Sequence, residues 1–116
     1  MRSFSFLKIE RLLNRKDFVN LNRLGKRYGT KHFTVILEQN GVGITRLGTI
    51  VSKKTGNAVK RNKVKRLIRE FFRLNKSYLP QGYDLVIVAK KGAHDLNFWK
   101  LKEELDEIIL DKKFRI

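Results

Sequence analysis

Apolar side chains recur with two different periods along this chain, and the change of period marks out its elements. Between Asn57 and Leu74 the apolar positions follow the spacing i, i+3, i+4, i+7, i+8, which predicts an amphipathic helix. Residues Leu96 to Leu110 keep the same spacing and predict a second one. The stretch Arg11 to Leu24 predicts a shorter helix, which Gly25 stops.

Other segments have the character of strands. His32 to Glu38 and Ile44 to Ser52 are rich in β-branched and aromatic residues, and Asn40-Gly41 between them is a strong hairpin signal. We therefore predict two antiparallel strands joined as a hairpin. The continuous apolar run Tyr83–Ala89 predicts a strand that is buried on both faces. A short edge strand is expected at Lys26–Gly29, on a weaker signal.

The order of these elements predicts an α+β fold. We expect an αβββαβα sandwich, with a mixed sheet of three to four strands, helices packed against it, and an open cleft on the face that the helices leave uncovered. No linker, repeat or low-complexity tract interrupts the chain. Residues 1–116 are therefore expected to form a single domain, a size at which most of a real core can be buried.

Charge is the property in which the chain departs most from an average domain. It carries 27 Lys and Arg against 11 Asp and Glu, a net charge of +16, so a polyanion is the expected partner. The absence of cysteine excludes disulfides and thiol chemistry. The longest apolar run, Leu85–Ala89, is far short of the roughly 20 residues that span a bilayer. With no secretory signal at the amino terminus, a cytoplasmic protein without membrane attachment is expected.

The predicted helix from Asn57 carries much of this charge, and Glu70 is the lone acid between Lys53 and Arg73. A helical wheel places Lys65, Arg66 and Arg69 opposite the apolar stripe, so one face packs and the other is cationic. Cations also crowd the first turns, where the helix dipole disfavours them. Such a face is often merely solvated, but this arrangement opposes folding and favours an anionic ligand that compensates it.

The string KKTGNAVKRNKVKRLIRE, residues 53–70, resembles the RNR signature of bacterial ribonuclease P protein subunits. Further segments are similar to that family in order and spacing: Lys16-Asp17-Phe18, Gly25, Arg46-Leu47-Gly48, the segment 51–54 and Tyr83–Ala89. The resemblance covers about residues 10 to 110, nearly the whole chain.

This resemblance implies a noncatalytic protein in a ribonucleoprotein that removes the 5′ leader of precursor tRNA. The catalytic groups are expected on the RNA and its Mg²⁺ ions, with ribonuclease P RNA and precursor tRNA as partners and no protein partner required. The RNR positions are implied to face the catalytic RNA. Together with the flanking basic segment, the residues expected to bind RNA are Lys53, Lys54, Asn57, Lys60, Arg61, Asn62, Lys63, Lys65, Arg66, Arg69 and Arg73.

The resemblance also implies that a cleft between the first helix and the sheet holds the single-stranded leader. Phe18 matches an aromatic residue of that cleft, and Phe33 is a second candidate, with ordinary core packing as the alternative for each. Two positions depart from the family pattern, because Asn22 and Ile36 stand where aromatic residues are often found.

The residues indicate no catalytic or metal site within the protein itself. His32 and His94 lack metal-ligand spacing and are interpreted as structural or exposed. The acids of the last helix, Glu103 to Glu107, are interpreted as a solvated face. Two alternatives stay open: a structural RNA-binding protein of the ribosomal kind, and a protein-only nuclease that uses these carboxyl-terminal acids.

Overall fold

The structure is a computed structural model in which residues 21, 23–79 and 81–109 are described. Leu21, Arg23 and Leu24 are helical, and the predicted start of their helix lies outside the described residues. The elements that follow match the predicted order. They are the strands β1 (Lys26–Gly29), β2 (Phe33–Gln39), β3 (Arg46–Val51) and β4 (Tyr83–Ala89), the helices α2 (Ala58–Asn75) and α3 (Phe98–Ile109), and the short 3₁₀ turns η2 (Lys53–Thr55), η3 (Lys76–Tyr78) and η4 (Ala93–Asp95).

The four strands form one mixed sheet in the order β1-β2-β4-β3. The strand β2 is antiparallel to both β1 and β4, whereas β3 runs parallel to β4. The predicted hairpin between β2 and β3 is therefore wrong, because β4 lies between these two strands. The hairpin that does form joins β1 to β2.

Local hydrogen bonds explain why Asn40-Gly41 does not close a hairpin. The backbone N–H of Asn40 donates to the carbonyl oxygen of Gly82 at 2.8 Å, which extends the pairing of β2 with β4. The Asn40 side-chain amide donates to the carbonyl oxygen of Ile44 at 2.8 Å and to Asp84 Oδ1 at 2.9 Å. The segment is thus a wider loop that carries the chain past β4 to the far edge of the sheet.

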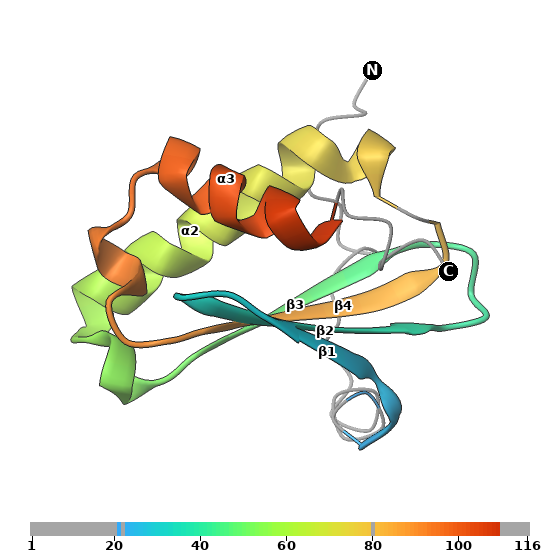
Figure 1. Ribbon diagram of the computed structural model, residues 1–116, viewed down its shortest axis with the longest axis horizontal. Helices are drawn as coiled ribbons and strands as arrows, with labels where there is room; N and C mark the ends of the chain where they lie inside the picture. Colours follow the sequence, from blue (N-terminus) through green and yellow to red (C-terminus); the bar gives the residue numbers. More distant parts are fainter. Residues whose placement is uncertain (1–20, 22, 80, 110–116) are drawn as a thin grey trace.

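The main core lies between one face of the sheet and the two helices (Figure 1). Alternate strand residues, among them Leu47, Leu85 and Ile87, point towards α2 and α3 and are almost fully buried. In α2 the predicted stripe is confirmed, since Val64, Ile68 and Phe71 are wholly buried and Phe72 is nearly so.

The opposite face of the sheet carries a smaller apolar cluster of Leu21, Ile36 and Val86. The strand β4 is thus buried on both faces, as its continuous apolar sequence predicts. Gly25 lets the helix end approach the sheet closely, because a Cβ there would lie 2.7 Å from Ile36 Cγ2. The leader cleft on this face stays a prediction. No helix within the described ranges has the length and apolar character needed to cross a membrane.

Candidate nucleic-acid interface

The loop before α2 gives the helix a well-defined start. Asn57 is the N-cap, and its side-chain oxygen accepts a hydrogen bond from the backbone N–H of Lys60 at 3.0 Å. One turn earlier, the Ser52 hydroxyl accepts from the backbone N–H of Lys54 and caps η2. Asn57 therefore has a structural role that its RNA-binding assignment did not include. The first turn of α2 contains no acidic residue, so the positive end of the helix dipole is left to an external anion.

The two faces of α2 differ as the helical wheel predicts. Asn62, Arg66 and Arg69 are exposed on the side away from the core, and Lys65 beside them is half-buried. Neither Arg66 nor Arg69 pairs with a carboxylate in the described part of the chain. Their guanidinium groups can therefore meet phosphate oxygens without first breaking an ion pair.

The remaining cations of the RNR string differ in their availability. Lys53, Lys54 and Lys60 are exposed around the start of α2. In contrast, the Lys63 ammonium group donates to the backbone carbonyl of His94 at 2.9 Å, which connects α2 to η4. Arg61 is half-buried beside them. The charge of this region is thus presented mainly by its lysines and by the outward arginines.

Arg73, at the end of the cationic face, is held by an acid. Its Nε and Nη2 atoms donate to the two carboxylate oxygens of Glu70 at 3.1 and 2.7 Å. These hydrogen bonds and the neighbouring negative charge raise the pKa of Arg73. A phosphate would have to displace Glu70 to reach this guanidinium, so Arg73 is a weaker candidate than Arg66 or Arg69.

The structure excludes one of the two residues predicted to bind the leader. Phe33 is 0% exposed and packs in the main core beneath α2 and α3, on the opposite side of the sheet from the predicted cleft. Its alternation with Thr34 along β2 turns it inward, so core packing is its role. Phe18 and Asn22 lie outside the described residues. Ile36 does face the other side of the sheet, but it is only 3% exposed.

Sequence reasoning missed a second group of cations, which the strand register brings together. Ala89 is paired with both Phe33 and Val51, so β4 and β3 end where β2 begins. Lys90 and Lys91 directly follow Ala89, and Lys31 lies two residues before Phe33. All three lysines are exposed. This is the end of the sheet from which the chain continues from β3 into η2 and α2 (Figure 1). The signal was available only once β4 was placed at the centre of the sheet.

The acids of α3 are not one uniformly solvated face, which corrects that interpretation. The Glu104 side chain is 13% exposed and is 2.9 Å from Nδ1 of His32, whose own side chain is 17% exposed. Asp106 pairs with Lys102 at 2.6 Å. Glu103 and Glu107 are exposed. His32 and Glu104 therefore both have a structural role.

The described residues do not fit a Mg²⁺ ion held by the protein. Within them no three His, Asp or Glu side chains are grouped closely enough to bind a metal. The candidate interface presents ammonium and guanidinium groups, whereas Mg²⁺ requires oxygen ligands. No step of a reaction is therefore assigned to an ion bound to this chain.

Comparisons with known proteins agree with this arrangement. The sequence profile of the Ribonuclease P family matches residues 6–113. The ribonuclease P protein component of Syntrophus aciditrophicus is 42% identical over 109 residues, which is 94% of this chain and 92% of that protein. The one from Geobacter sp. strain M21 is 49% identical over 106 residues, which is 90% of each chain.

Solved structures give the same result for the fold. The RNase P protein of Thermotoga maritima superposes with a TM-score of 0.79 at 38% identity, covering 86% of this chain and 94% of that one. The RNase P protein of Staphylococcus aureus has a TM-score of 0.82 at 33% identity, covering 90% and 96%. Because the profile spans nearly the whole chain and the fold agrees, this chain belongs to the bacterial ribonuclease P protein family.

Proposed function

We propose that this chain binds the catalytic RNA of ribonuclease P through the cationic face of α2 and assists removal of the 5′ leader from precursor tRNA. The observation that carries the proposal is the outward, unpaired presentation of Arg66 and Arg69 within the described residues, on a helix whose start is ringed by exposed lysines. Guanidinium groups bind phosphate through two parallel hydrogen bonds, and RNA offers phosphates at regular spacing.

Within this proposal the protein contributes binding and charge, and the RNA contributes the chemistry. Cations on α2 replace part of the counterion atmosphere that a folded RNA requires, so the protein lowers the Mg²⁺ concentration at which the complex is active. The metal ions themselves are held mainly by the RNA. The family and the charge also favour a cytoplasmic location.

Leader binding is proposed for the face of the sheet opposite α2 and α3. With Phe33 removed from the set, Phe18 is the aromatic residue that remains a candidate there. Arg27 on the edge strand β1 is paired with Ile36 and therefore shares its face of the sheet, which supports a contact between this basic side chain and the leader backbone.

The test is reconstitution at low Mg²⁺. Precursor tRNA is incubated with this protein alone, with a bacterial ribonuclease P RNA alone, and with both. We expect cleavage at the mature 5′ end only in the combined reaction. Cleavage by the protein alone would move the active site into this chain and revive a protein nuclease that uses acids such as Glu103 and Asp106.

A second arm separates a processing subunit from a ribosomal-type RNA-binding protein. The assembled complex is titrated with leader-bearing tRNA and with mature tRNA of the same sequence. The proposal predicts tighter binding of the leader-bearing form when the protein is present. Equal affinity for the two tRNAs, with no effect of the protein on cleavage, would contradict it.

A further inference from the structure

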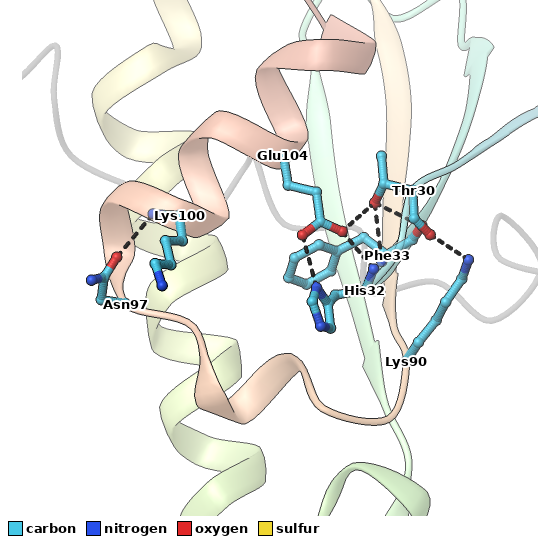
Figure 2. A network of polar contacts seen from close by, with 7 residues as sticks. All are labelled: Thr30, His32, Phe33, Lys90, Asn97, Lys100 and Glu104. Atoms are coloured by element: carbon cyan, nitrogen blue, oxygen red, sulfur yellow. Dashed lines mark hydrogen bonds and ion pairs between the residues drawn. The ribbon is translucent and has the colours of Figure 1, made fainter.

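Glu104 of α3 connects two distant parts of the fold through one carboxylate (Figure 2). Its Oε1 atom accepts hydrogen bonds from the Thr30 hydroxyl at 2.6 Å and from the backbone N–H of His32. Its Oε2 atom lies 2.9 Å from Nδ1 of His32. The carboxylate therefore ties α3 to the turn between β1 and β2, more than 70 residues away in sequence.

The strand that leads into this turn contributes little stability of its own. The strand β1 has only four residues, sits at the edge of the sheet and is mostly exposed. Short edge strands gain little stability from their own pairing. Burial would raise the pKa of Glu104, but the hydrogen bonds from Thr30 and His32 outweigh it and lower the pKa below its usual value, so the carboxylate is charged at neutral pH.

The same contacts extend to the lysines at the end of the sheet. The carbonyl oxygen of Thr30 accepts a hydrogen bond from the Lys90 ammonium group at 2.6 Å, and the backbone N–H of Lys90 donates to the carbonyl oxygen of His32 at 2.8 Å. The loop after β4 passes close to the ring of His32, since a Cβ on Gly92 would lie 3.4 Å from its Cδ2 atom. Displacement of the turn would therefore displace Lys90 and Lys31.

We propose that Glu104 is a positioning residue for RNA binding, which holds the β1–β2 turn so that Lys31 and Lys90 meet phosphates beside the start of α2. This inference rests on the proposed function. By charge alone, a carboxylate next to phosphate-binding lysines weakens RNA binding. Removal of Glu104 should therefore weaken RNA binding if it positions the lysines, whereas loss of its charge alone would strengthen binding.

The experiment compares Glu104→Ala, Glu104→Gln and Glu107→Ala in the full chain, at one salt concentration. Glu107 is an exposed acid on the same helix and serves as the charge-matched control. We expect Glu104→Ala to bind ribonuclease P RNA on the order of 3- to 10-fold more weakly, as for the loss of one well-placed hydrogen bond. Glu107→Ala is expected to bind as tightly as the unchanged chain or more tightly.

Glutamine can reproduce the hydrogen-bonding geometry of Glu104 without its charge. Its amide oxygen accepts from Thr30 and the His32 backbone, and its amide nitrogen can donate to Nδ1 of His32. Glu104→Gln should therefore stay within about twofold of the unchanged chain. In precursor cleavage, Glu104→Ala should raise KM at unchanged kcat, because positioning affects binding and not the chemical step.

A double variant tests whether Glu104 acts through Lys90. The loss in affinity for Lys90→Ala with Glu104→Ala should be smaller than the sum of the two single losses. Each variant is assayed well below its own melting temperature, measured by circular dichroism. Affinity of Glu104→Ala equal to that of Glu107→Ala, equal losses for the Ala and Gln variants, or additive losses would each overturn the inference. Failure of the unchanged chain to bind the RNA would instead contradict the proposed function.

Discussion

The cationic face of α2 is not uniform, and the salt dependence of RNA binding should show this. Arg66 and Arg69 are exposed and unpaired within the described residues, whereas Arg73 is held by both oxygens of Glu70. We therefore predict that replacing Arg66 and Arg69 by alanine flattens the salt dependence, and that the same change at Arg73 has much less effect.

The magnitude follows from how many phosphates the altered protein no longer neutralises. Each neutralised phosphate adds about −0.7 to the log–log slope of affinity against salt for single-stranded nucleic acid, and about −0.9 for a duplex. Removing Arg66 and Arg69 together should thus reduce the slope by roughly 1.4 to 1.8. Binding should weaken by about 1–3 kcal/mol for each charge-assisted hydrogen bond to phosphate that is removed.

The assay measures the affinity for ribonuclease P RNA from about 50 to 200 mM monovalent salt, the range over which such slopes are well defined. Glu70→Gln is a useful companion, because it releases Arg73 and should tighten binding. An equal change of slope for Arg73→Ala and Arg66→Ala would show that Glu70 does not restrain Arg73. An unchanged slope for the double variant would remove this helix face from the interface.

Three further predictions concern the scaffold. Asp84 is 7% exposed and accepts hydrogen bonds from Arg46 and Asn40. Asp84→Ala should therefore lower the free energy of unfolding, measured in urea, by about 2 to 3 kcal/mol. A loss below about 1 kcal/mol would contradict the buried role of the Arg46–Asp84 ion pair. Gly25→Ala would place a Cβ 2.6 Å from the Leu21 carbonyl oxygen, so it should lower the melting temperature by several degrees, as followed by circular dichroism. Because folding lowers the pKa of Glu104, its contribution to stability is complete above the unfolded-state value near 4.5 and is lost as the pH falls below it. Unfolding measured between about pH 3 and 6 should therefore show a steeper acid loss for the unchanged chain than for Glu104→Gln.

The elements of this fold could be predicted from the sequence because each has a strong local signal. The strands β1 and β4 lie at their predicted bounds, and α2 begins at Ala58, one residue after the predicted start of the helical spacing at Asn57. Hydrophobic period and capping residues act over a few neighbouring positions, so one sequence contains enough information to locate them.

Contacts between distant segments were harder to infer. The Asn40-Gly41 signal favours a local hairpin, but the apolar run of β4 requires burial on both faces, and only a central position supplies it. The need to bury both faces of β4 therefore determines the strand order and outweighs the hairpin preference of Asn40-Gly41. The Glu104 contacts were missed for the same reason, since an acid on an amphipathic helix gives no sign of a partner such as His32.

The candidate site shows the same division. The exposed cations of α2 follow from the helical wheel, whereas the lysines at positions 31, 90 and 91 join them only through the strand register. Phe33 was placed on the wrong side of the sheet, because an aromatic residue in a strand has equal access to either face until its neighbours are known.

The central position of β4 also governs the order in which the chain can fold during synthesis. The strand β3 pairs with no described strand except β4, and β4 begins at Tyr83. Until the ribosome has released β4, the nascent chain can form the β1–β2 hairpin but cannot complete the sheet or cover α2. Completion of the sheet therefore waits for the synthesis of β4, and chains that terminate before Ala89 should be substrates for chaperones and proteases instead of partly active fragments.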